Sequence, residues 1–313
     1  MKTSRLGPAV VAVALCVAAS GPGCGRKAEE ETATKGRLSV CVSEAHLELF
    51  QREADQFNSL YKEAGVAVFG ATTREAIVNL LNDSVPMIAT DRPLNAEEQA
   101  VVVRDKIDIQ EVAIARDALA IVVSRLNGAG TFSMESLQDM LTRKVTDWSQ
   151  VPGSGLVGPI ELVLTDRNSG AYELVKEHFF DLAEDLPVAV VLASQRAVVE
   201  YVGKHPQALG MVSVACYRSP SVGAVTADSS GTVKALAFAG VDSTGQQATH
   251  RLHQANIHLG RYPLGYDVYI YFSKDSDLAA GFAGFVAGAE GQKIVLDWGL
   301  VPVTMPVRIV TLT

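Results

Sequence analysis

Short apolar runs alternate with amphipathic segments from residue 37 to residue 104, and this alternation restricts the folds open to the chain. Residues 38–42, 66–69 and 85–89 have the length and apolar character of buried strands, whereas the segments that follow them carry apolar side chains at helical spacing. A strand–helix–strand–helix–strand order predicts a parallel sheet with helices on both faces. We therefore expect an α/β fold.

The same alternation continues to the C-terminal part of the chain. Further strands are expected at residues 118–123, 160–164, 209–214, 233–238 and 268–272. Helices are expected at residues 47–64, 95–104, 131–141, 172–180, 195–202 and 279–298, and one more ends near residue 81. Asn95 and Ser133 are expected to cap two of these helices, because their side-chain oxygens can accept from the backbone N–H groups that a helix start leaves without partners.

Polar turns follow the first three expected strands and supply hydroxyl and carboxylate groups. Ligands of parallel sheets bind beyond the carboxyl ends of the strands, so these side chains are expected to meet there. The candidate residues in the three turns are Ser43, Thr72, Thr73, Thr90 and Asp91.

A fourth polar turn joins the expected strand at 160–164 to the helix at 172–180. Asn168 or Ser169 can cap that helix, and Gly170 allows a ligand to approach the backbone closely. The start of a helix favours an anion, because its N–H groups lack partners and its dipole is positive there. An ordinary cap without a ligand is the alternative interpretation of this turn.

The chain begins with the features of an export signal. A short basic region precedes residues 9–19, an apolar stretch too short to span a bilayer as a mature helix. Small residues then lead to Cys24, an order that resembles a bacterial lipoprotein signal, with Gly21 as a departure from that pattern. We expect residues 1–23 to be removed, Cys24 to be lipidated and residues 24–36 to form a flexible tether. Plain secretion is the alternative.

Size and composition limit the ligands that the mature chain can take. About 290 of the 313 residues remain after the leader, which suits two lobes or one large α/β domain. The net charge of −8 is unclustered and aromatic residues make up 6% of the chain, so nucleic acid and stacked sugars are not expected as ligands. Cys41 and Cys216 are expected to be buried thiols, with a disulfide as the alternative.

Two patterns that could indicate catalysis or a metal are discounted. Tyr172 and Lys176 have the spacing used by short-chain dehydrogenases, but no glycine-rich dinucleotide turn follows the first strand. His250, His253 and His258 lie in a polar stretch without acidic or cysteine residues, so a solvated loop is expected there. We expect no catalytic residues, no cofactor and no metal.

A series of short segments, spread over nearly all of residues 37–302, occurs in an order typical of one protein family. The segments are residues 88–94 (Ile-Ala-Thr-Asp-Arg-Pro-Leu), 115–123, 132–148, 168–170 (Asn-Ser-Gly), 208–211, 261–264, 269–271 and 285–302. In this order they resemble the periplasmic phosphate-binding proteins that feed ABC phosphate importers and have the type II solute-binding fold.

The resemblance implies two lobes, each a mostly parallel sheet flanked by helices, with the ligand enclosed between them. Two crossings are expected, near Ala115 and Ala224, so that residues 37–114 and 225–313 form the first lobe and residues 115–224 the second. The implied ligand is inorganic phosphate, and the implied partner is an ABC permease. The resemblance also implies a monomer that is exported to the periplasm or the cell surface.

The resemblance assigns a specific role to Asp91, with Thr90 beside it as a donor. Phosphate carries a proton at neutral pH, so a carboxylate can accept a hydrogen bond from it while repelling fully ionised sulfate. The resemblance places further donors at Ser43, Thr72, Thr73, Ser169 and the Gly170 backbone. Without the resemblance, a turn or helix cap before Pro93 is the simpler interpretation of Asp91.

Two positions depart from the family pattern in the fourth turn. Thr165 stands where the family has an arginine, and Ala171 where it has a threonine. Arg92 or Arg167 could supply a guanidinium instead, although a surface salt bridge is an equally good interpretation of Arg167. The ligand could therefore be another small oxyanion.

The first turn, residues 43–47, also differs from the small hydroxyl-rich turns usual in the family. Glu44 would bring negative charge close to an anion and is expected to point to solvent. His46 could carry part of the positive charge when protonated.

Two functions remain: a lipid-anchored binding protein that delivers phosphate to a permease, or a ligand sensor or scaffold with the same fold and no role in transport.

Overall fold

A sheet of ten strands runs through the residues that the structure, a computed structural model, describes: 30–180, 186–222, 231–241 and 245–304. Across the sheet the order is β2 (Ala64–Ala71), β1 (Gly36–Ser43), β3 (Met87–Thr90), β12 (Gly265–Ser273), β4 (Ile109–Ser124), β8 (Ala208–Ser213), β6 (Glu161–Thr165) and β7 (Val190–Leu192). β9 (Val233–Ala235) and β13 (Val301–Pro302) also pair with β4. A smaller sheet contains β11 (Gln247–His250), β10 (Ala237–Val241) and β5 (Thr131–Phe132). The predicted signal peptide and Cys24 lie outside the described residues.

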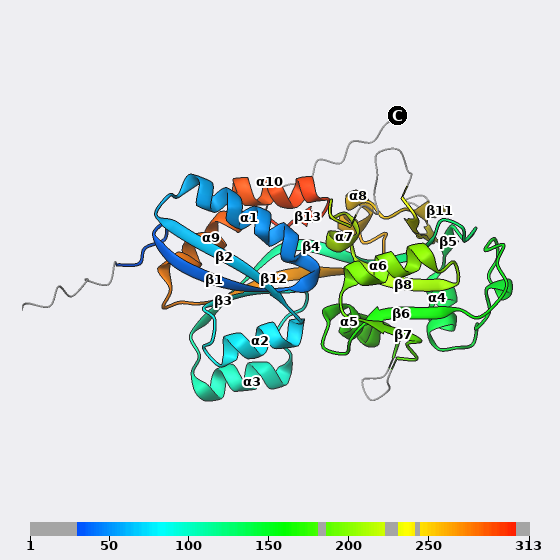
Figure 1. The fold of residues 1–313 in the computed structure, drawn as a ribbon, viewed down its shortest axis with the longest axis horizontal. Helices are drawn as coiled ribbons and strands as arrows, with labels where there is room; N and C mark the ends of the chain where they lie inside the picture. The colour runs from blue at the N-terminus through cyan, green and yellow to red at the C-terminus, as the bar shows by residue number, and fades with distance from the viewer. Residues whose placement is uncertain (1–29, 181–185, 223–230, 242–244, 305–313) are drawn as a thin grey trace, which may run out of the picture.

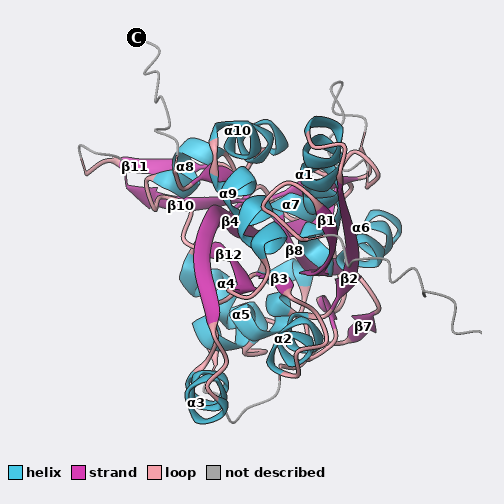
Figure 2. Ribbon diagram, turned by 90° about the vertical axis from the view of Figure 1, so that its left-hand side faces the viewer, coloured by secondary structure: helices cyan, strands magenta, loops and turns pink. Residues whose placement is uncertain are grey.

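Helices cover both faces of the large sheet (Figures 1 and 2). They are α1 (Leu47–Leu60), α2 (Thr73–Leu81), α3 (Ala96–Asp105), α4 (Met134–Leu141), α5 (Gly170–Phe179), α6 (Gln195–Lys204), α7 (Val214–Tyr217), α8 (Gln254–His258), α9 (Asp277–Ala287) and α10 (Ala289–Trp298), with 3-10 turns η1 (Glu44–His46) and η2 (Trp148–Gln150). None of these described helices has the length and apolar character needed to cross a bilayer.

The pairing directions divide the large sheet into two lobes. β2, β1 and β3 are parallel at one end, and β8, β6 and β7 are parallel at the other. Between them β12 and β4 run antiparallel to their neighbours. Figure 1 shows these two strands passing from one lobe to the other. The predicted α/β fold, with a mostly parallel sheet in each lobe, is confirmed.

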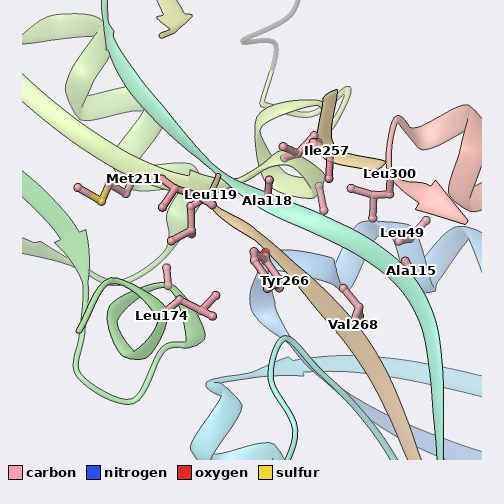
Figure 3. Close-up of a cluster of buried hydrophobic side chains, with 14 of the residues drawn as sticks. Leu49, Ala115, Ala118, Leu119, Leu174, Met211, Ile257, Tyr266, Val268 and Leu300 are labelled. Carbon is pink, nitrogen blue, oxygen red and sulfur yellow. The ribbon is translucent and has the colours of Figure 1, made fainter. Parts of the chain in front are cut away.

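The crossing strands are also the centre of the hydrophobic core. β4 pairs with β12 up to Ala118 and with β8 from Leu119, so one continuous strand serves both lobes. Ala118, Leu119 and Val268 are at most 1% exposed, and Figure 3 shows them among the buried side chains of the cluster. Close packing around both strands restricts how the lobes can move relative to each other.

The expected caps are present, but three of the expected helices have clearly different boundaries. The helix expected at residues 131–141 begins at Met134, because Thr131 and Phe132 form β5. The side chains of Asn95 and Ser133 accept from the backbone N–H three residues on, as predicted. α1 ends at Leu60, before the predicted residue 64, because Ala64 begins the strand that pairs with β1. The single helix expected at residues 279–298 is two helices, since Gly288 is extended between them (φ −83°, ψ 178°).

The strand pairing bears on the predicted lobe ranges, which stay a prediction. β9 pairs with Val122–Ser124 of β4, and β10 pairs with β5. Both partners belong to the segment expected in the second lobe. The pairing thus favours a return to the first lobe at β12, later in the chain than residue 224.

Residues 30–36, the end of the predicted tether, pack on the first lobe, and the tether itself stays a prediction. The Glu31 carboxylate accepts hydrogen bonds from Ser276 Oγ (2.7 Å) and from the Leu278 N–H (3.1 Å) at the start of α9. The Ala33 carbonyl lies against Gly281, where a Cβ atom would be 1.9 Å away. The reason is therefore local: α9 offers an unpaired N–H group and a glycine surface that the chain can cover.

Glu31→Ala is expected to reduce the free energy of unfolding by about 1 kcal/mol, the usual cost of losing a side-chain acceptor at a helix start. Urea denaturation at pH 7 measures the change. Glu30→Ala, at the exposed neighbouring position, is the matched control and should leave stability within about 0.5 kcal/mol. Equal effects of the two variants would contradict the capping role.

Glu53 of α1 is a buried carboxyl group in the first lobe. It is 0% exposed, and neither oxygen has a hydrogen-bond partner among the described residues. Burial raises its pKa to about 9, and Arg52 offsets this only in part. Because the folded state holds this proton more tightly than the unfolded chain, stability is lost as the pH rises from about 4.5 towards 9.

Glu53→Gln should flatten that pH dependence by about 1.4 kcal/mol per pH unit between pH 5 and 8. Denaturant unfolding of both proteins across this range is the measurement. Asp55→Asn, on the exposed face of the same helix, should leave the slope unchanged. A variant with the slope of the parent protein would show that Glu53 does not hold its proton.

Candidate functional site

The Asp91 carboxylate, directly after β3, is the centre of the candidate site. It is 2% exposed and accepts hydrogen bonds from two hydroxyl groups of the first lobe. Thr73 Oγ1 donates to Oδ1 at 2.6 Å, and Ser43 Oγ donates to Oδ2 at 3.2 Å. The carboxyl ends of β1 and β3 and the start of α2 meet here, as predicted for a parallel sheet.

The second lobe contacts this carboxylate through Gly170, the first residue of α5. A Cβ atom at Gly170 would lie 2.0 Å from Asp91 Oδ1, so only glycine fits. Nearby, the Arg74 N–H in the first turn of α2 donates to the Asn168 carbonyl at 3.3 Å. The starts of α2 and α5 therefore face each other across Asp91. A ligand was expected to approach the Gly170 backbone closely, and in this structure the Asp91 side chain occupies that place.

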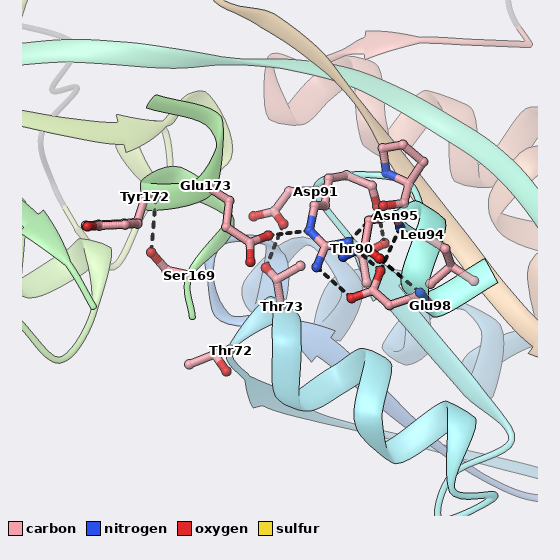
Figure 4. Close-up of polar contacts among 12 residues, drawn as sticks. Thr72, Thr73, Thr90, Asp91, Leu94, Asn95, Glu98, Ser169, Tyr172 and Glu173 are labelled. Carbon is pink, nitrogen blue, oxygen red and sulfur yellow. Dashed lines mark hydrogen bonds and ion pairs between the residues drawn. The ribbon is translucent and has the colours of Figure 1, made fainter. Parts of the chain in front are cut away.

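Thr72 and Ser169 cap the two helices that face each other. Thr72 Oγ1 accepts from the Glu75 N–H at 3.3 Å, and Ser169 Oγ accepts from the Tyr172 N–H at 3.2 Å. In Figure 4, Ser169 and Tyr172 lie to the left of Asp91, and Thr72 and Thr73 lie below it. Both caps follow from the sequence pattern, because Ser and Thr are preferred at the position before a helix.

Arg92 forms ion pairs with carboxylates of both lobes. Its guanidinium donates to both oxygens of Glu98 at 2.7 and 2.9 Å, and its Nε donates to Glu173 of α5. Thr90 Oγ1 donates to the Arg92 carbonyl at 2.9 Å and so stabilises the turn. Burial raises the pKa of Glu173, whereas hydrogen bonds from Arg92 and the Asn95 N–H outweigh burial and lower the pKa of Glu98.

The remaining predicted residues of the fourth turn lie towards the surface. Arg167 and Asn168 are exposed, while Thr165 is buried and donates to Ser169 Oγ at 2.6 Å. Thr165, which stands where the family has an arginine, thus supports the cap of α5. The structure brings Ser43, Thr73, Asp91 and Gly170 into contact and places Arg92 on neighbouring carboxylates.

Glu44 does not point to solvent as expected, and that prediction is wrong. Its carboxylate accepts from the Gln195 N–H at 2.8 Å, at the start of α6 in the second lobe. An unpaired helix N–H is a favourable partner for a carboxylate, which explains the inward orientation. Burial and the nearby Asp91 raise the pKa of Glu44, although the Gln195 N–H lowers it.

Sequence reasoning missed the role of Asp117, a fully buried carboxylate on β4. It accepts from the N–H groups of Ala118 (2.6 Å) and Val214 (3.0 Å) and from the hydroxyl of Tyr266 (3.1 Å). His46 Nε2 contacts the same carboxylate at 2.9 Å. The available signal was a charged residue directly before the apolar run at 118–123, since a charge inside a buried strand needs dedicated partners.

Other expectations can be compared with the described residues. Cys41 and Cys216 are buried free thiols, as predicted, and Cys216 lies in α7. Burial raises the pKa of both thiols, which makes them poor nucleophiles. No group of three or more His, Cys, Asp or Glu side chains suited to a metal occurs in the described residues.

Arg92→Gln should reduce the free energy of unfolding by roughly 3 kcal/mol at pH 7, because two largely buried carboxylates lose their shared cation. The loss should shrink as the pH falls through the raised pKa of Glu173 and then through the lowered pKa of Glu98, because each carboxylate loses its charge there. Denaturant unfolding at several pH values tests this. The control is Arg196→Gln, whose exposed pair with Glu200 should contribute less than about 1 kcal/mol. Similar losses in both variants would rule out a structural role for the Arg92 pairs.

Comparisons with known proteins agree with the fold. Protein SphX of Synechococcus elongatus is 23% identical over 263 residues, which are 82% of this chain and 74% of that protein. A Clostridium perfringens structure, described as a phosphate ABC transporter substrate-binding protein with bound phosphate, has a TM-score of 0.72 at 20% identity and covers 86% of this chain and 100% of its own. An ABC-type phosphate transport receptor from Vibrio cholerae has a TM-score of 0.63 at 22% identity, with coverage of 86% and 100%.

The predicted type II solute-binding fold is confirmed by these likenesses. A family model described as the PBP superfamily domain matches residues 27–290 of the chain. The match includes most of both lobes, the crossing strands β4 and β12, and the residues Ser43, Thr73, Asp91 and Gly170. The chain therefore belongs to the PBP superfamily.

Proposed function

We propose that the protein binds inorganic phosphate between its lobes and delivers it to an ABC importer. The observation that carries this proposal is the buried Asp91 carboxylate, which lies between hydroxyl donors of the first lobe and the Gly170 backbone of the second. A carboxylate has about four acceptor sites, and two hydroxyl groups use two of them. The others can accept from a ligand that carries its own proton, as phosphate does at neutral pH.

The surrounding groups supply the donors that a dehydrated oxyanion needs. The first turns of α2 and α5 present backbone N–H groups with the positive end of each helix dipole, whereas the hydroxyl groups of Ser43 and Thr73 donate to Asp91. Charge-assisted hydrogen bonds to an ionised ligand are stronger than neutral ones. A ligand bound here would contact both lobes, so binding would favour the closed arrangement.

The names of the relatives support transport over catalysis. SphX, the Clostridium perfringens protein and the Vibrio cholerae receptor cover most of the chain, and two of the three are named as phosphate transport components. We infer a binding protein and not an enzyme. It would act as a monomer that is exported, lipid-anchored through Cys24 and docked on a permease at the membrane.

A second candidate is the same fold with another small oxyanion, or with a sensing role. Thr165 and Arg92 favour it, because Thr165 supports a cap and Arg92 is paired with Glu98 and Glu173. Neither side chain gives the guanidinium that the family pattern uses.

Titration calorimetry separates the two candidates. The protein, starting at residue 25, is unfolded and refolded to remove bound ligand and is then titrated with phosphate and afterwards with sulfate. Phosphate binding with little response to sulfate would support the phosphate-binding function. Sulfate binding of comparable strength would support a different oxyanion as the ligand.

Asp91→Asn should weaken phosphate binding about tenfold or more, because an amide replaces the carboxylate that accepts the ligand proton. Sulfate should bind the variant better than it binds the parent protein, since the repelling charge is gone. Asp275→Asn makes the same chemical change at an exposed position and should bind phosphate normally. Unchanged phosphate affinity in a folded Asp91→Asn protein would refute the role of Asp91.

A further inference from the structure

His46 lies in a buried position next to the candidate site, at the end of η1. It is 1% exposed, and both ring nitrogens have partners. Nδ1 lies 3.3 Å from Ser43 Oγ, and Nε2 lies 2.9 Å from Asp117 Oδ2. Its ring is nearly perpendicular to that of Tyr266, with 6.4 Å between the ring centroids. A line of hydrogen bonds thus runs from Asp91 through Ser43 and His46 to Asp117.

The protons along this line fix the charge of His46. Ser43 has a single hydroxyl proton, which it donates to Asp91, so Nδ1 of His46 must donate to Ser43 Oγ. Nε2 faces a carboxylate, which accepts only, so it must donate as well. A histidine that donates from both nitrogens is an imidazolium.

Asp117 has the surroundings of an ionised carboxylate. Besides His46, it accepts from the N–H groups of Ala118 and Val214 and from the Tyr266 hydroxyl, and several such donors favour the charged form. Asp117 also lies where β4 changes partner from β12 to β8, that is, at the crossing between the lobes. The His46–Asp117 pair therefore joins the anion site to the hinge.

We propose that His46 is the buried cation and positioning residue of the anion site, and that phosphate binding is coupled to its protonation. This inference rests on the proposed function and deepens it. The imidazolium orients Ser43 towards Asp91 and places positive charge beside a ligand that otherwise faces carboxylates. His46 thus supplies positive charge from the first lobe. In the family pattern an arginine supplies it from the second lobe, at the position where this chain has Thr165.

The groups that face His46 are mostly acidic. They are Asp117 on β4, Tyr266 on β12, Asp91 after β3 and Glu44 on the same turn. Burial alone would lower the pKa of His46, but the hydrogen bond and the charge of Asp117, with the charges of Asp91 and Glu44, raise it above its usual 6.5. The stability that the charged ring contributes is complete below pH 6.5 and is lost as the pH rises through the higher folded value.

An NMR titration of the wild-type ring nitrogens tests the coupling. Without ligand, both His46 nitrogens should be protonated at pH 6.5. Saturating phosphate should raise the pKa of His46 by about one unit, because a tenfold preference of phosphate for the charged form requires that shift by linkage. The exposed His205 is the internal control, and its ring signals should not respond to phosphate. A neutral His46 at pH 6.5, or a pKa unmoved by bound phosphate, would overturn the inference.

His46→Gln adds a second, independent readout. Glutamine keeps a donor and an acceptor but cannot carry charge. Its phosphate affinity should be about tenfold below that of the wild type at pH 6. The ratio of wild-type to variant affinity should approach one as the pH rises above the pKa of His46. His205→Gln should show a ratio of one throughout.

The outcomes separate this inference from the function on which it rests. If the ratio of wild-type to His46→Gln phosphate affinity does not change with pH, His46 has a merely structural role and the coupling is overturned. Phosphate binding with an unresponsive His46 would overturn the coupling and leave the proposed function intact. Failure of the wild-type protein to bind phosphate at pH 6 and pH 8 would overturn both. If His46→Gln does not fold, the wild-type NMR titration still decides the question.

Discussion

The contact between the two lobes requires that the carboxylates buried there have hydrogen-bond or ionic partners. An isolated buried charge is very costly, and it is tolerated only with hydrogen bonds and counter-charges around it. Asp91 obtains these from Ser43 and Thr73, and Asp117 obtains them from backbone N–H groups, Tyr266 and His46. Because the donors come from β1, α2, α7 and β12, satisfying the two carboxylates also fixes how the lobes meet.

The same requirement explains the other contacts between the lobes. Glu44 uses the free N–H at the start of α6, Glu48 accepts from Ser219 and Ser221, and Glu173 pairs with Arg92. Each contact matches a carboxylate to donors from a helix start, from serine hydroxyl groups or from a cation. The lobes therefore meet largely through polar groups, whereas the crossing strands β4 and β12 carry the apolar packing. Such a division suits a protein whose lobes separate around a rigid hinge.

Much of the fold could be read from the sequence, because it depends on local patterns. The strand–helix alternation, the caps at Asn95 and Ser133, and the turns that end β1 and β3 all follow from residue type and spacing. The orientations of Glu44, His46 and Asp117 could not, because they depend on the Glu44–Gln195 and His46–Asp117 contacts, whose partners are 151 and 71 residues apart in the chain. Arg92 shows the same limit: its neighbour Asp91 suggested a ligand contact, while Glu98 and Glu173 provide its partners.

A crystal structure of the protein grown with phosphate tests the central claim most directly, which is that Asp91 and the start of α5 enclose a protonated oxyanion. We expect phosphate between the first turns of α2 and α5, with one oxygen within hydrogen-bond distance of an Asp91 carboxylate oxygen and another near the Gly170 N–H. Phosphate bound elsewhere, or bound between the lobes with Asp91 turned away from it, would contradict this account.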